Sequence, residues 1–228
     1  TIGFFADILE DSGDVNENVR LIIRETIKNH KNIIFNGNGY DESWIKEATE
    51  KRGLLNYRTT VDCMPHLMDE KNVEMLIRQK VYTEAELRSR HDIMLENYNR
   101  TVIIEANTMV GMAKIHIVPA IEKYCADVAA CAASKKAVCP DLACGYESSL
   151  VSRLSSLIDE ISAGYGGLES AIAEAGAAED VLAKAELIRD SVLPKMSGLR
   201  LACDEAETLT ARSYWPFPTY GDILYSVH

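Results

Sequence analysis

The chain has 228 residues, 47% of them hydrophobic, and its 24 Lys and Arg against 35 Asp and Glu give a formal net charge of -11. This length allows one large domain or two small ones. An acidic surface repels nucleic-acid backbones and anionic lipid, and no run of about 18 apolar residues is free of charge, so we expect neither a nucleic-acid nor a membrane partner. The six Cys lack the spacing of a disulfide framework, which favours a reduced, cytoplasmic protein.

Alanine is concentrated in the second half of the chain and indicates the fold class. Of the 24 Ala, 21 lie between residues 101 and 211. Ala is the best helix former, and the 13 Gly and 6 Pro are too few for a turn-rich β architecture. The composition therefore predicts a mostly α fold.

The chain begins with a hydrophobic, helix-like run and has no initiator Met. We expect residues 1–14 to be the end of a helix whose partners lie upstream, in a longer protein. Removal of Met before Thr1 is the alternative explanation.

Residues 15–82 predict a small mixed α/β subregion. Val15, Val19, Ile22, Ile23 and Ile27 lie on one side of an amphipathic helix. The remaining expected elements are a strand at 33–35, a turn at 36–40, a helix at 41–51, an irregular segment at 54–69 and a helix over 70–80.

Residues 83–212 predict long helices in an antiparallel bundle. A capping box at Thr83–Glu86 starts a helix of about 55 residues that runs to Val138. Pro119 must kink it, because proline removes a backbone N–H bond and clashes one turn back. A loop and two further helices follow, over 147–174 and over 178–212, the second with an internal Pro194. The apolar residues of the first are spaced as a seam along one side of the helix: Leu150, Leu154, Leu157, Ile161, Leu168 and Ile172.

Residues 213–228 differ from the bundle and predict an extended, aromatic tail. Trp215, Phe217 and Tyr220, stiffened by Pro216 and Pro218, would form an exposed apolar patch if they were solvated. They dock either onto the chain's own bundle or onto another domain or subunit, so they are candidate interface residues.

The search for chemistry finds no catalytic, cofactor-binding or metal-binding residues. The five His form no metal-spaced pair, and His116, among apolar neighbours, reads as a packed core residue. The loop Asn36, Gly37, Asn38, Gly39, Tyr40 precedes a helix and could hold an anion. It lacks the rest of a nucleotide-binding motif, so a tight turn is the competing explanation.

Several strings resemble one family, the type III glutamine synthetases, in their C-terminal region. They are His30–Tyr40, Val81–Arg90, Leu95–Tyr98, Ile104–Met109 and Tyr214–Asp222, of which the last is the most specific. The resemblance runs from about residue 15 to the end of the chain.

The resemblance implies a cytoplasmic, mainly bacterial parent enzyme that ligates ammonia to glutamate through γ-glutamyl phosphate, using ATP and Mg²⁺ or Mn²⁺. It also implies an upstream catalytic domain and a homo-oligomer of two stacked hexameric rings. The family's metal-binding Glu and phosphate-binding Arg residues precede this region and match no position here. We therefore expect a structural and assembly domain that is inactive alone and holds no cofactor.

Two other functions remain open from the residues. One is a regulatory or small-molecule-binding helical module, for which the loop at 36–40 is the candidate site. The other is a free-standing helical interaction protein, which a start codon directly before Thr1 would favour.

Overall fold

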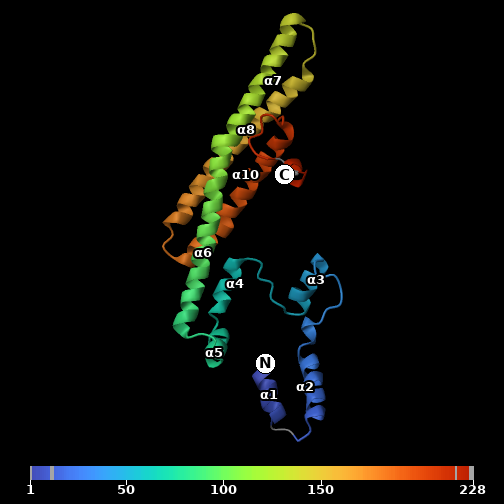
Figure 1. Ribbon diagram of the computed structural model, residues 1–228, viewed down its shortest axis with the longest axis vertical. Helices are drawn as coiled ribbons and strands as arrows, with labels where there is room; N and C mark the ends of the chain where they lie inside the picture. Colours follow the sequence, from blue (N-terminus) through green and yellow to red (C-terminus); the bar gives the residue numbers. More distant parts are fainter. Residues whose placement is uncertain (1, 11–12, 219, 226–228) are drawn as a thin grey trace. The chain divides into compact units, whose positions relative to one another are not determined.

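Apolar residues at helical spacing form helices along the chain. The computed structural model describes residues 2–10, 13–218 and 220–225, and these contain no strand (Figure 1). They divide into two compact units, Thr1–Arg58 and Thr59–His228, each of which is described by itself. The predicted mostly α fold is confirmed.

The first unit consists of short helices that bury very little. Its elements are α1 (Ile2–Glu10), α2 (Val15–Asn29), a 3-10 turn (Lys31–Ile33), α3 (Glu42–Lys46) and a π turn (Glu47–Lys51). Asp14 starts α2 by accepting a bond from the Asn16 N–H at 3.0 Å, and Asp41 starts α3 through the Ser43 N–H at 2.8 Å. Among the unit's described residues, Ala48 alone is buried.

The strand predicted at 33–35 is wrong. Ile33 ends the 3-10 turn, and Ile34 and Phe35 have no strand beside them in the described residues. Side chains take the place of a sheet: Arg52 donates from Nη1 to the Ile34 carbonyl at 2.7 Å, and the Phe35 ring stacks on Trp44 with centroids 3.8 Å apart. The described part of this unit is therefore helical rather than mixed α/β.

The second unit begins with a helix where the sequence predicts an irregular segment. This helix, α4 (Thr60–Leu67), starts at the Thr59 hydroxyl, which accepts from the Asp62 N–H at 3.1 Å. It buries Val61 and Met64. Only eight residues long, and with Pro65 inside, it gives a weak periodic signal, which explains the wrong prediction. The predicted helix after it is present as α5 (Glu70–Arg78).

The predicted bundle follows and forms most of the second unit (Figure 1). At its start the capping box is present, with the Thr83 N–H donating to Glu86 Oε2 at 2.8 Å and the Glu86 N–H donating to Thr83 Oγ1 at 3.3 Å. The bundle elements are α6 (Glu84–Gly111), a π turn (Met112–Ile117), α7 (Val118–Val138), α8 (Gly145–Ala177), α9 (Val181–Leu187), a second π turn (Ile188–Val192) and α10 (Leu193–Leu209).

Both prolines within the bundle helices follow a π turn. The Val118 N–H bonds to the Ala113 carbonyl, five residues back, and Pro119 comes next; the Leu193 N–H bonds to Ile188 in the same way before Pro194. A π turn adds a residue, which gives the proline ring room beside the preceding carbonyls. The helices therefore continue past both prolines, and the predicted helix of 55 residues is confirmed.

The core of the bundle is a seam along α8. Leu154, Leu157, Ile161 and Leu168 are fully buried against α6, α7 and α10, which lie beside α8 (Figure 1). Gly164 allows α10 to approach closely, because a Cβ there would lie 3.3 Å from Leu199 Cδ1. The seam predicted over 147–174 is confirmed.

Length and composition alone would let one described helix cross a membrane, the one from Glu84 to Val138. Its most apolar window of 18 residues has a mean hydropathy of 1.2, and 28% of that window is buried. Core helices of bundles pass the same test, and Val102, Ala106 and Val110 of this helix are in the bundle core.

An ion pair joins α7 to α8 at the far end of the bundle. Lys135, in the last turn of α7, donates to Glu147 in the first turn of α8. Each charge is also stabilised by the helix dipole, because the cation lies at a C-terminus and the anion at an N-terminus. The Glu147 side chain is only 11% exposed. Its hydrogen bond from Lys135 lowers the pKa of the Glu147 carboxyl below its ordinary value.

Acidification should weaken the bundle through Glu147. A carboxyl whose pKa is lowered by folding stabilises the fold above its unfolded pKa and loses that contribution as the pH falls through the folded pKa. We expect the free energy of unfolding, measured by urea titration at each pH, to fall more between pH 6 and pH 3 in the unchanged 228-residue chain than in Glu147→Gln. Glu122→Gln, an exposed change on α7, should keep the pH dependence of the unchanged chain. An equal fall in the unchanged chain and in Glu147→Gln would contradict this role.

Candidate functional site

The histidines that the structure describes do not gather into one site. His66 Nδ1 lies 3.0 Å from Asp69 and His91 Nδ1 lies 2.9 Å from Asp92, each within one stretch of chain. His116, predicted to be a core residue, is exposed and meets the Phe217 ring edge-on at 5.7 Å. In the part of the chain that the structure describes, no three His, Cys, Asp or Glu side chains lie close enough to hold a metal.

The loop at 36–40 is a tight turn held on a ring stack. The Tyr40 N–H donates to Asn38 Oδ1 at 3.1 Å, and a Cβ at Gly37 would lie 2.5 Å from the Phe35 ring, so a larger residue there would displace that ring. Arg52 packs on Trp44 with its guanidinium 4.8 Å from the ring centre.

Two carboxylates already occupy the positions that an anion would need near this loop. Asp41 accepts from the Ser43 N–H in the first turn of α3, and Glu47 accepts two bonds from Arg52, at 2.9 Å and 2.7 Å. The geometry favours a structural turn, and ligand binding by the loop stays a prediction.

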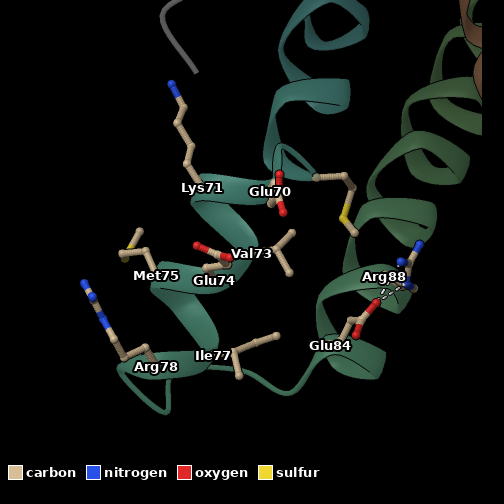
Figure 2. A pocket seen from close by; sticks show the side chains of 10 residues that line it. Glu70, Lys71, Val73, Glu74, Met75, Ile77, Arg78, Glu84 and Arg88 are labelled. Atoms are coloured by element: carbon tan, nitrogen blue, oxygen red, sulfur yellow. Dashed lines mark hydrogen bonds and ion pairs between the residues drawn. The ribbon is translucent and has the colours of Figure 1, made fainter.

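A hollow of about 800 Å³ lies between α5 and the first turn of α6. Figure 2 shows Val73 and Ile77 pointing towards α6, whereas Lys71 and Arg78 point away from it. Arg88 is paired with Glu84 at 2.7 Å. The charged groups that line this hollow therefore do not converge on one point, as a catalytic or anion-binding site would require.

The C-terminal segment docks onto the bundle of its own chain. Trp215 and Phe217, two of the predicted interface residues, pack against the main apolar core. Tyr214 fixes the segment by donating from Oη to Asp127 on α7 at 2.6 Å. The side chain of Tyr220, the third, lies outside the described residues. The predicted extended conformation is wrong for residues 220–225, which form the helix α11 (Tyr220–Tyr225).

A cleft of about 460 Å³ lies between this segment, α6 and α10. Its walls are mainly apolar, and its rim carries carboxylates. The apolar lining includes Met109, Met112, Met196, Cys203, Trp215 and Phe217, and the charged lining is Glu105, Arg200, Asp204 and Glu207. Burial raises the pKa of the Cys203 thiol to about 11, so that wall is neutral.

No pattern in the sequence signals this cleft. Its walls come from residues about 100 positions apart, at Met109 and Phe217 for example, and helical spacing cannot show which faces meet. The one available signal is the run of Trp and Pro residues at 215–218, which marks the segment but not the surface that receives it.

The fold and the cleft thus define an all-helical domain whose described surface offers an apolar cleft but no converging cluster of reactive groups. A family model for the glutamine synthetase C-terminal domain matches residues 18–136. The chain therefore belongs to the glutamine synthetase C-terminal domain family, as the resemblance implied.

Three relatives extend the similarity to nearly the whole chain. It is 33% identical to a glutamine synthetase of Butyrivibrio fibrisolvens over 95% of this chain, which is 31% of that protein. It is 26% identical to a type-3 glutamine synthetase of Dictyostelium discoideum over 90% of this chain and 28% of that protein. It is also 26% identical to a glutamine synthetase of Bacteroides fragilis, over 96% of this chain and 30% of that protein. The chain thus spans about a third of the length of these relatives.

Removing the Trp215 ring should destabilise the bundle. Because the ring is partly buried against the core, we expect Trp215→Ala to lower the free energy of unfolding by about 2 kcal/mol, measured by urea denaturation and circular dichroism. Tyr146→Ala, which removes a ring that is 71% exposed on α8, should change it by less than about 0.5 kcal/mol. Equal small effects would mean that Trp215 adds nothing to the fold of its own chain.

Proposed function

We propose that this chain is the C-terminal structural and assembly domain of a type III glutamine synthetase, without catalytic residues of its own. Its family, and the fact that it matches about a third of each relative, support a domain within a larger enzyme. Its partner in this proposal is the catalytic domain upstream in the same chain.

The parent enzyme of the proposal ligates ammonia to glutamate with ATP through γ-glutamyl phosphate. ATP and Mg²⁺ or Mn²⁺ are bound by the catalytic domain, and the helical domain described here binds none of them. The parent is cytoplasmic and bacterial and assembles as two stacked hexameric rings. The match of this chain to glutamine synthetases supports the reaction.

A stripe of exposed apolar residues on α2 carries the assembly role. Val15, Val19, Ile23 and Ile27 follow one another at intervals of four, which places them on one face of the helix. All four are exposed, Ile23 and Ile27 by 53% each. The adjoining face of α2, at Ile22, faces α1 instead.

An apolar stripe of this length is rarely left to solvent, because covering it stabilises by about 25 cal/mol for each Å² removed from water. The stripe lies near the N-terminal end of the region that the C-terminal-domain model matches, and in the proposal the catalytic domain precedes this region. We therefore assign it to packing on the catalytic domain.

The isolated chain should not make glutamine. We expect no product above background from the purified 228-residue chain with ATP, Mg²⁺, glutamate and ammonia, because in the proposal the groups that bind these ligands belong to the upstream domain. The full-length enzyme, assayed in parallel, is the positive control. Glutamine formation by the isolated chain would overturn the proposal.

Polar substitution of the stripe should break assembly but not the fold of this chain. Because Ile23 and Ile27 are exposed, Ile23→Ser with Ile27→Ser should change the unfolding free energy of the 228-residue chain by less than about 0.5 kcal/mol. In the full-length enzyme the pair should lose on the order of 3 kcal/mol of docking energy, measured as dissociation in sedimentation velocity.

A matched pair on the same helix provides the control. Arg24→Ser with Lys28→Ser has the same spacing and exposure but removes no apolar surface, so assembly should persist. Dissociation by both pairs would point to a general disturbance of α2, and assembly by both would contradict the docking role.

The second candidate function, a small-molecule-binding module, is favoured by one observation. The cleft beside the C-terminal segment falls within the size range of small-molecule sites, about 300–1,000 Å³. A binding role can coexist with the assembly role, because the cleft and the α2 stripe lie in different units.

A further inference from the structure

The cleft between α6, α10 and the C-terminal segment has the composition of a ligand site. Three Met side chains line it, and their flexible thioethers adapt to ligands of varied shape. Trp215 and Phe217 add aromatic faces that are only partly buried. A planar apolar group entering the cleft would therefore find both ring and thioether contacts.

The charges at the rim select the sign of the ligand. Glu105, Asp204 and Glu207 supply three carboxylates against the single guanidinium of Arg200. Arg200 Nε donates to both oxygens of Asp204, at 2.8 Å and 3.0 Å, so this cation is already matched by one of the carboxylates. Two carboxylates thus remain in excess and attract a positive group while repelling phosphate or carboxylate ligands.

We propose that this cleft binds a small organic cation, a protonated amine attached to a flat apolar ring. The ring lies among Met109, Met196 and Trp215, and the ammonium group lies at Glu105 and Glu207. An aromatic ring beside an ammonium also gains from cation–π attraction. The site is independent of the ligase chemistry and of the α2 stripe.

Phenethylamine is the probe, and two analogues keep its ring while changing its charge: 2-phenylethanol is neutral and 3-phenylpropionate is negative. The readout is the set of seven methionine methyl resonances of the 228-residue chain, labelled with ¹³C and assigned by single Met→Leu changes. Three of them line the cleft, at Met109, Met112 and Met196. The other four serve as internal controls, at Met64, Met68, Met75 and Met94.

Phenethylamine should shift the three cleft methionines saturably and bind at least fivefold more tightly than 3-phenylpropionate. Glu105→Gln with Glu207→Gln should weaken phenethylamine at least fivefold and leave 2-phenylethanol unchanged. Glu174→Gln, an exposed change on α8 outside the cleft, should alter neither. The preference should also shrink as salt is added.

Three results would overturn the proposal. They are equal shifts at the four control methionines, a preference for the amine smaller than fivefold, and loss of 2-phenylethanol binding together with the amine in the double Gln variant. Because the assay uses no glutamine synthesis and no assembly, its failure leaves the proposed assembly function untouched.

Discussion

The architecture of the second unit depends on the apolar seam of α8. Leu154, Leu157, Ile161 and Leu168 are completely buried, and α8 packs against α6, α7 and α10. Burying such side chains is the dominant favourable term in folding. The position of α10 is set from this seam, by the close approach at Gly164, and the cleft exists because α10 and α6 are held at that spacing.

The prolines show how this chain keeps long helices along the seam. A proline inside a helix costs a hydrogen bond and a clash. Here a π turn precedes both Pro119 and Pro194, so α6 and α7 remain one rod and α9 and α10 remain another. Met112, the first residue of one π turn, also lines the cleft, so the wide turn contributes to the binding surface.

The spacing of apolar residues along the chain predicted the features that depend on local sequence. The long helices, the capping box at Thr83 and the seam of α8 follow from local spacing, and they are present. The prediction failed where tertiary contacts decide. Ile34 has the β propensity of a strand residue, but its carbonyl accepts a hydrogen bond from Arg52 instead of from a neighbouring strand. The helix α4 is too short to give a clear periodic pattern of apolar residues. The cleft could not be predicted, because residues far apart in sequence form it; likewise, the sequence left open which surface receives Trp215.

The first unit has another consequence for a domain of an assembled enzyme. A unit whose described residues bury only Ala48 has little folding free energy of its own. Its order is therefore coupled to docking, since whatever covers the α2 stripe stabilises the folded form by mass action. In the proposed enzyme this coupling would separate assembled from orphan subunits. In an orphan subunit of that enzyme α1 and α2 would unfold at little cost and become accessible to proteases, whereas in an assembled one they would be protected.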